Sequence, residues 1–100
     1  MKMYILVKQS LPSHKVVAVA HGSLMCYLKY QNEPEMKEWL EKSFRKVVCE
    51  VSDVEFENAK LVEKNVIVTE SALGGSEVGL VFCPRNEWPT QFKFFKLMKI

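Results

Sequence analysis

The chain has 100 residues, a length typical of one domain that can bury a core without disulfides or metals. Apolar residues make up 48% and charged residues 26%, which is ordinary for a soluble globular protein, and no run reaches the ~18 apolar residues of a membrane-spanning helix. The net charge of +2 is too small to indicate nucleic-acid binding by itself. From the length and composition we expect a single cytoplasmic domain over residues 1–100, with no membrane segment.

The first predicted elements are a buried strand and an amphipathic helix. Residues 3–7 are continuously apolar, as in a strand covered on both faces. Ser13 can cap the helix that follows. Gly22 within this helix indicates close packing on a sheet, because an isolated glycine costs ~1 kcal/mol against alanine. The apolar positions at helical spacing predict a core-facing stripe of Val16, Val17, Ala20, Leu24, Tyr27 and Leu28.

The middle of the chain predicts two more helices and two more strands. Residues 32–35 start a helix with a cap, an early proline and an acidic first turn. Residues 46–51 form a strand, and Ser52 with Glu55 has the spacing of a capping box before the third helix. Residues 66–69 form the third strand. The predicted apolar faces are Met36, Trp39, Leu40 and Phe44 in the second helix, and Val54, Ala59, Leu61 and Val62 in the third, with Phe56 on its flank.

The last third of the chain begins with a loop over residues 70–76, ESALGGS, that contains two glycines. Residues 78–82 form a fourth strand. A short helix opens at residues 86–90 and carries Phe92, Phe94 and Phe95. Residues 96–100 alternate in polarity, which predicts a short extended segment.

This order of elements predicts an α/β fold with three layers, in which helices cover both faces of a four-stranded mixed sheet. The short link between the third and fourth strands allows either a hairpin or a jump to the sheet edge. Ligands of such sheets bind beyond the carboxyl ends of the strands. Three segments meet there: residues 10–15, the start of the helix at Ser52, and residues 70–76.

Several polar groups near this rim are candidates for chemistry. Lys15 and Glu70 could face each other, so that the ammonium stabilises an oxyanion and the carboxylate takes a proton. The alternative is a surface ion pair worth ~0–1 kcal/mol. Backbone N–H groups of residues 74–76 could bind an anion, although the spacing and lysine of a P-loop are absent. His21 fits a partly buried structural histidine better than a catalytic one.

The cysteines favour neither a metal centre nor a thiol nucleophile. Cys26, Cys49 and Cys83 are scattered through apolar runs, which is typical of reduced, buried thiols in a cytosolic protein. No C-x-x-C pair is present, and His14 with His21 at i,i+7 does not supply a close zinc-ligand pair. The sequence therefore predicts no metal.

Five segments share their order and character with a known family. They are a strand in YILVKQSLP, a helix in HKVVAVAHGSLMCYLKY, a strand and cap in KVVCEVSD, and the closing FCP and KLMKI. Over nearly the whole chain this pattern resembles the type II peptidyl-tRNA hydrolase family of archaea and eukaryotes. The resemblance implies a four-stranded mixed sheet flanked by helices, and hydrolysis of the ester that joins a peptide to the 3′ end of tRNA. It also implies no metal or other cofactor, and commonly a dimer.

The resemblance assigns roles to individual residues. Lys15 matches the family's lysine at the start of the first helix, whereas Val19 stands where a glutamine is expected. Gly22 takes the position of a histidine, which His21 matches only if one residue is skipped. Glu70 is the nearest acid to the family's aspartate, in a shorter loop where Ser71 or Ser76 could supply a hydroxyl in place of a threonine.

Three functions fit these residues. The first is a divergent peptidyl-tRNA hydrolase acting on the peptide–tRNA ester or a related acyl bond. The second is a non-catalytic module that binds tRNA or another phosphate-bearing ligand, a nucleotide, an RNA end or a protein. The third is a structural homodimer built on exposed aromatic side chains. The candidate catalytic residues are Lys15, Glu70 and His21, and the candidate anion or substrate contacts are Ser13, Ser71, Gly74, Gly75 and Ser76.

Overall fold

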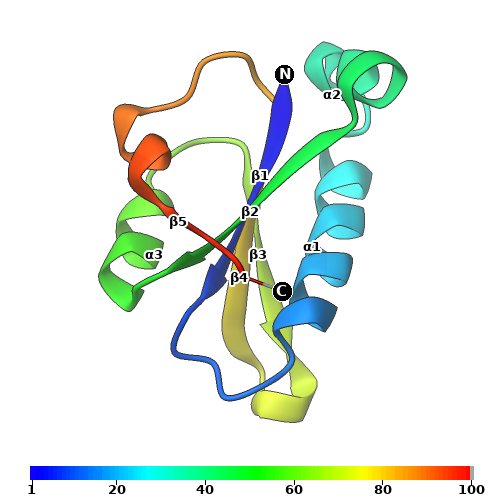
Figure 1. The fold of residues 1–100 in the computed structure, drawn as a ribbon. Coiled ribbons are helices and arrows are strands. Elements are labelled where there is room, and N and C mark those ends of the chain that lie inside the picture. The colour runs from blue at the N-terminus through cyan, green and yellow to red at the C-terminus, as the bar shows by residue number, and fades with distance from the viewer. Residues whose placement is uncertain (100) are drawn as a thin grey trace.

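The computed structural model describes residues 1–99 and contains a five-stranded mixed sheet with helices on both faces (Figure 1). The strands lie in the order β3-β4-β1-β2-β5. β1 and β2 are parallel, and every other neighbouring pair is antiparallel. The predicted three-layer α/β fold is confirmed. The strand bounds are β1 Lys2–Lys8, β2 Arg45–Val51, β3 Asn65–Glu70, β4 Ser76–Phe82 and β5 Lys96–Leu97.

The sheet has one strand more than the sequence predicts. β5 comes from the predicted extended segment, and it pairs with Cys49 and Glu50 of β2. A strand of two residues cannot be distinguished from coil by the alternation of polarity in the sequence. β5 is recognised as a strand only by its pairing with β2. Residue 100 of the same segment lies outside the described residues. The link between β3 and β4 is the hairpin alternative, with a 3₁₀ turn at Ser71–Leu73.

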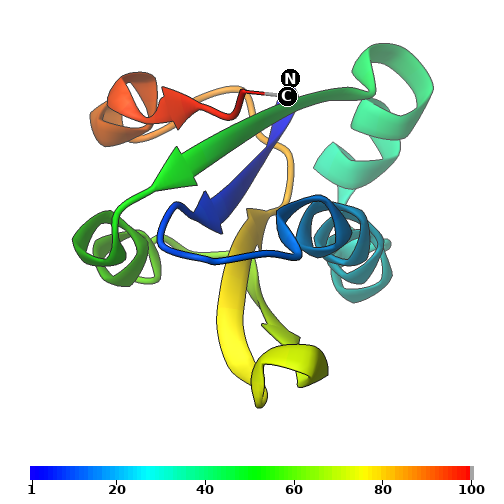
Figure 2. The same cartoon turned by 60° about the horizontal axis from the view of Figure 1, so that its bottom comes forward.

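The helices divide between the two faces of the sheet. Helix α1 (Lys15–Tyr30) lies over β1, β3 and β4, and α3 (Asp53–Ala59) lies on the opposite side (Figures 1 and 2). Helix α2 (Pro34–Glu38) continues into a π-helical turn, Trp39–Ser43, and a 3₁₀ turn at Thr90–Phe94 precedes β5. No helix among residues 1–99 has the length and apolar character needed to cross a membrane.

Each face of the sheet has its own core because successive side chains of a strand point to opposite sides. From β1, Met3, Ile5 and Val7 pack on the α1 side, whereas Tyr4 and Leu6 pack on the α3 side. All five are buried, so the prediction of a strand covered on both faces is confirmed. The α3-side core is rich in aromatic rings: Tyr4, Phe56, Phe82, Phe92 and Phe95.

The predicted core-facing stripe of α1 is wrong. Its large members point away from the sheet, and Leu24 and Leu28 are 60% and 55% exposed. Of the six, only Tyr27 packs against the core. The buried residues of the helix are instead Ala18, Gly22 and Cys26, spaced four apart. Small side chains on this face let the helix axis approach the sheet closely, so the bulkier apolar side chains lie outside.

The predicted apolar faces of the other two helices are confirmed in part. In the third helix, Ala59 is buried and Val62 packs against the core as predicted, and Phe56 is buried as well. Val54 and Leu61 of the same predicted face are 70% and 87% exposed. In the second helical segment Met36 and Trp39 are buried as predicted, but Leu40 and Phe44 are exposed.

The two ends of the second helical segment explain part of this outcome. The π turn changes the residue spacing and ends at Phe44 in a left-handed conformation, with φ 52°, so the simple helical period fails there. Helix α2 has Pro34 in its first turn as predicted, but its N-cap is Glu33 and no side chain caps it.

The predicted capping box of α3 is confirmed. The Glu55 N–H donates to Ser52 Oγ at 3.1 Å, and the Ser52 N–H donates to Glu55 Oε1 at 2.8 Å. Two of the unpaired N–H groups at this helix start are thereby satisfied. The capping box fixes α3 at the residue where β2 ends.

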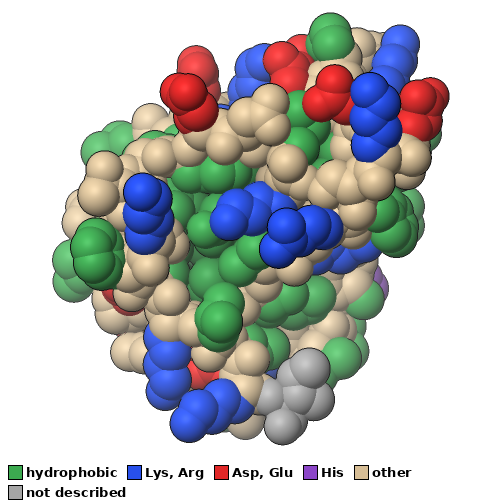
Figure 3. All heavy atoms as spheres, turned by 45° about the horizontal axis from the view of Figure 1, so that its top comes forward, with side chains coloured by type: hydrophobic (Ala, Val, Ile, Leu, Met, Phe, Trp, Pro, Cys, Tyr) green, Lys and Arg blue, Asp and Glu red, His purple; other side chains and the backbone are tan. Residues whose placement is uncertain are grey.

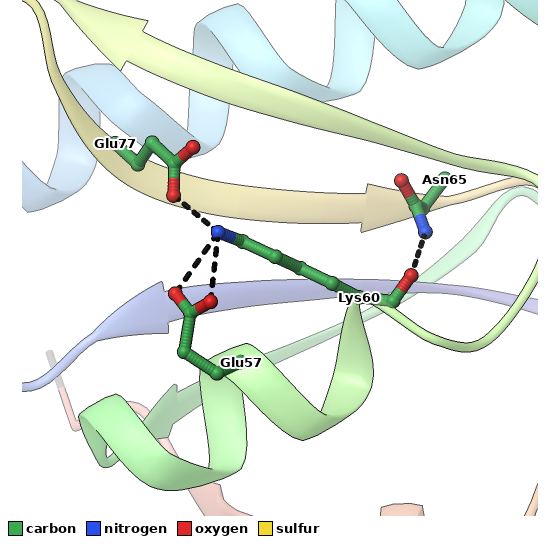
Figure 4. Close-up of polar contacts among 4 residues, drawn as sticks. All are labelled: Glu57, Lys60, Asn65 and Glu77. Atoms are coloured by element: carbon green, nitrogen blue, oxygen red, sulfur yellow. Dashed lines mark hydrogen bonds and ion pairs between the residues drawn. The ribbon is translucent and has the colours of Figure 1, made fainter.

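The opposite end of α3 is tied to the sheet by Lys60 (Figure 4). Its Nζ pairs with Glu57 Oε2 at 2.9 Å and with Glu77 Oε1 of β4 at 2.5 Å. These hydrogen bonds, first that with Glu77, raise the pKa of Lys60. Asn65 Nδ2 donates to the Lys60 carbonyl at 3.2 Å, so α3, β3 and β4 meet at one polar contact.

Candidate functional site

Three strands end at the same edge of the sheet. β1 and β2 are parallel, and β3 runs in the same direction because both β1 and β3 are antiparallel to β4. The turn before α1, the start of α3 and the β3–β4 loop follow these strand ends, as predicted (Figure 1). The Gln9 N–H donates to the Val51 carbonyl at 2.9 Å, and Ser10 Oγ donates to Asp53 Oδ1 at 3.0 Å, which joins the first two segments.

Lys15 is the first residue of α1 and forms an ion pair at this edge. Its Nζ lies 3.6 Å from Glu50 Oε2, and the two side chains are 29% and 17% exposed. A cation at a helix N-terminus is electrostatically unfavourable, and Glu50 offsets that effect. Within residues 1–99 the acidic partner of Lys15 is therefore Glu50 and not Glu70. The catalytic roles of Lys15 and Glu70 stay predictions.

Sequence reasoning missed Glu50, although two signals indicate it. The residue lies one position before the end of β2, and alternation along that strand places it on the same face as Val48. What could not be predicted is the lateral position of α1, which brings Lys15 to that face. Glu50 therefore joins the candidate site as the group that holds the Lys15 ammonium.

The loop after β3 is organised by its own hydrogen bonds. Glu70 Oε1 accepts from the Ala72 N–H at 3.3 Å, and the Glu70 carbonyl accepts from the Gly75 N–H at 2.9 Å. The Gly74 N–H donates to the Ser71 carbonyl at 3.1 Å, and Ser76 Oγ donates to the Leu73 carbonyl at 2.7 Å. An anion bound to the N–H groups of Gly74 and Gly75 would therefore have to compete with these bonds.

The two loop glycines have a conformational reason of their own. Gly74 has φ 69° and Gly75 has φ 78°, both in the left-handed region where a side chain is disfavoured. The tight link between β3 and β4 thus accounts for both residues without a ligand. Anion binding by this loop stays a prediction.

Two further candidates lie in positions that the sequence did not predict. Ser13 does not cap α1: the N-cap is His14, with φ 69° and no side-chain cap bond, while Ser13 Oγ and His14 Nδ1 share a hydrogen bond of 2.6 Å. His21 is exposed, so the expectation of a partly buried histidine is wrong. His21 lies six positions after Lys15 in the helix. This offset corresponds to ~9 Å along the helix axis and to a different side of the helix. His21 does not join the rim.

The cysteines are buried and free. Burial, with Cys83 as a lesser cause, raises the pKa of the Cys26 thiol to about 12, and burial raises the pKa of Cys49 and Cys83 to about 11. At neutral pH these groups stay protonated and are poor nucleophiles. No cluster of three or more His, Cys, Asp or Glu side chains suited to a metal occurs among residues 1–99.

Two hollows lie at the start of α1, and Lys15 lines the first of them. One is a shallow, open depression formed by residues 11–17. The other is lined by four apolar side chains, Val16, Val19, Val48 and Met98, and Val16 contributes to both. Figure 3 shows a face of the molecule where hydrophobic and basic side chains occupy the centre, while acidic ones gather mainly near its upper edge. The linings of the two hollows place apolar side chains at the start of α1, where Lys15 lies.

A comparison with protein families gives a match over most of the chain. A family model described as "Peptidyl-tRNA hydrolase PTH2" matches residues 1–70. The matched segment includes Lys15 and Glu50 and ends at Glu70, the last residue of β3. A comparison with curated proteins found no match.

Proposed function

Because the chain belongs to the peptidyl-tRNA hydrolase PTH2 family, we propose that it hydrolyses the ester between a peptide and the 3′ end of tRNA, or a related acyl bond. The observation that carries this proposal is the half-buried Lys15, held by Glu50 at the edge where three strands end. Both residues belong to the segment that matches the family. Such a substrate and the reduced thiols also fit a protein of the cytoplasm.

In the proposed reaction the Lys15 ammonium binds the carbonyl oxygen of the ester and stabilises the negative charge that develops on it. Glu70 positions a water molecule and accepts its proton as the water attacks the carbonyl carbon. The bond from that carbon to the 3′ oxygen then breaks, and the 3′ oxygen takes up the proton that Glu70 accepted from the water. Ser13, Ser71 and residues 74–76 are proposed to contact the phosphates of the tRNA end.

The direct test is turnover of N-acetyl-aminoacyl-tRNA by the wild-type protein, measured as release of the N-acetyl amino acid. We expect enzyme-dependent release that is linear in protein concentration and insensitive to EDTA. Release at the rate of buffer alone, by a protein whose circular dichroism shows a folded α/β domain, would exclude the hydrolase function.

The second candidate, a binding module without turnover, is favoured by Val19, which stands at the position where the family resemblance leads us to expect a glutamine. It predicts that deacylated tRNA or a short RNA ending in CCA binds while acylated tRNA is not hydrolysed. Titration of the same labelled RNA, followed by fluorescence anisotropy, separates the two functions.

We also propose that the protein forms a homodimer through the outer face of α1. Residues 16–28 contain no Asp, Glu, Lys or Arg, although this helix lies on the surface. A helix that is apolar on its outer face as well as on its inner face is normally covered by a partner. Val17, Leu24 and Leu28 are exposed along this face.

If this face is the interface, Leu24→Glu is expected to convert the dimer to a monomer, because it buries a charge without a partner. Sedimentation velocity measures the change. Leu61→Glu is the matched control, since Leu61 is exposed elsewhere and should leave the dimer intact. A wild-type chain that is monomeric at all concentrations up to the millimolar range would rule out this dimer.

A further inference from the structure

Helix α1 leaves part of its face of the sheet uncovered. The helix packs mainly over β3, β4 and β1, and Figure 2 shows it displaced from β5. The β2 side chains on this face are Lys46, Val48 and Glu50, because Val48 packs with the α1-side core and side chains alternate along the strand. Only the ends of this row are charged, which leaves Val48 as an apolar floor between them.

Within the described residues 1–99, the apolar hollow at the start of α1 occupies this strip. Val16 and Val19 of α1 form one wall, Val48 forms the floor and Met98 the other wall. The Met98 N–H donates to the Val48 carbonyl at 3.0 Å, which holds the segment after β5 against β2. The hollow has a volume of about 200 Å³. A protein cavity of ~150 Å³ accommodates benzene, so this one has room for a leucine or phenylalanine side chain.

The hollow and the Lys15–Glu50 ion pair involve neighbouring residues of α1 and β2. Val16 follows Lys15 in the chain, and Glu50, which pairs with Lys15, is two residues from Val48, or ~7 Å along the strand. Lys96 is the cross-strand partner of Glu50, so a second lysine side chain stands beside this carboxylate on the same face of the sheet. If the ester carbonyl of a substrate binds the Lys15 ammonium, the side chain of the same amino acid begins only two bonds from that carbonyl carbon. This side chain would therefore lie near apolar residues.

Val19 is the residue that gives the hollow its character. Val19 is half-buried and shares the hollow with Val16, Val48 and Met98, whose side chains offer no hydrogen-bond partner to a polar group. Valine therefore completes a wall without polar groups. This lining favours an apolar ligand.

We propose that this hollow binds the side chain of the amino acid whose ester bond is cut, and that it selects apolar side chains. The inference rests on the proposed hydrolase function and names its substrate class: peptidyl-tRNAs whose C-terminal amino acid is aliphatic or aromatic. Val19, Val48 and Met98 are then the residues that determine specificity.

The test compares N-acetyl-leucyl-tRNA with N-acetyl-aspartyl-tRNA as substrates of the wild-type protein. Apolar pockets discriminate by roughly 10- to 200-fold, so we expect kcat/KM for the leucyl substrate to be higher by at least about tenfold. Val19→Gln is expected to reduce this ratio by about tenfold. Val54→Gln makes the same change at an exposed position of α3 and should leave the ratio unchanged. Equal kcat/KM values for both substrates, or an unchanged ratio in Val19→Gln, would overturn the proposal.

A binding measurement keeps this proposal separate from the hydrolase function. The probes are adenosine analogues that carry N-acetyl-leucine or N-acetyl-aspartate through a 3′ amide, which the reaction cannot cleave as an ester. Methyl NMR signals of Val19, Val48 and Met98 are expected to shift with the leucyl probe at about tenfold lower concentration than with the aspartyl probe. A leucyl preference in binding without turnover of any tRNA would refute the hydrolase and retain the pocket. Turnover of tRNA substrates without a leucyl preference in turnover or in binding would support the hydrolase function and refute the pocket.

Discussion

Replacing Lys15 with alanine is expected to lower kcat/KM for peptidyl-tRNA hydrolysis by about 10²–10³-fold, the usual effect of removing one group that stabilises an oxyanion. The ammonium is the charged group that the turn before α1 holds at the sheet edge, and alanine leaves no donor in its place. The measurement is single-turnover release of the N-acetyl amino acid, with thermal unfolding of both proteins in parallel. Because the Lys15–Glu50 pair is partly exposed, its loss should change stability little.

Two further variants make the Lys15 result specific. Lys37→Ala removes an exposed lysine side chain from α2 and should retain wild-type turnover. Lys15→Arg keeps the charge but spreads it over a planar group, so we expect partial activity. Wild-type kcat/KM in Lys15→Ala would remove this residue from the reaction and with it the site proposed around it.

Replacing Gly22 with valine is expected to lower the free energy of unfolding by about 3 kcal/mol, at the upper end of the cost of overpacking a core. A Cβ atom at this position would lie 2.5 Å from Val81 Cγ2 and 3.1 Å from Val68 Cγ2, so α1 would have to move away from the sheet. Chemical denaturation monitored by circular dichroism gives the free energy. The same contacts confirm the prediction that Gly22 marks close helix–sheet packing.

The origin of the Gly22 effect can be checked by two companion variants. Ala20→Val adds a similar side chain to the exposed side of the same helix and should change stability by no more than ~0.5 kcal/mol. In a Val81→Ala background the cost of Gly22→Val should fall, because residues in contact couple. If the two costs simply add, the clash with Val81 is not the cause.

The sequence predicts the elements of this fold better than the faces they bury. The strand over residues 3–7 and the capping box at Ser52 depend on neighbours within a few residues, and both were predicted correctly. The buried face of α1 depends instead on how closely the helix approaches the sheet. Its inner residues are small, so a rule that assigns the largest apolar side chains to the core selects the wrong side.

The same distinction applies to the candidate site. Topology was sufficient to predict which three segments meet at the sheet edge. The partner of Lys15 was not predicted, because it depends on which strands α1 covers and on the β1–β2 register, and neither is encoded locally. The apolar hollow needs the additional strand β5, whose two residues carry too weak a pattern to be recognised.

The strand order has a consequence for synthesis of the chain from its N-terminus. β4 is inserted between β1 and β3, so β3 has no hydrogen-bonded neighbour in the sheet until residues 76–82 have been made. A nascent chain that ends at Glu70 contains the whole family-matching segment and can pair β1 with β2, but its α1-side core lacks Val78 and Val81. The segment that matches the family therefore joins β3 to the rest of the sheet only when β4, which lies beyond that segment, has been synthesised.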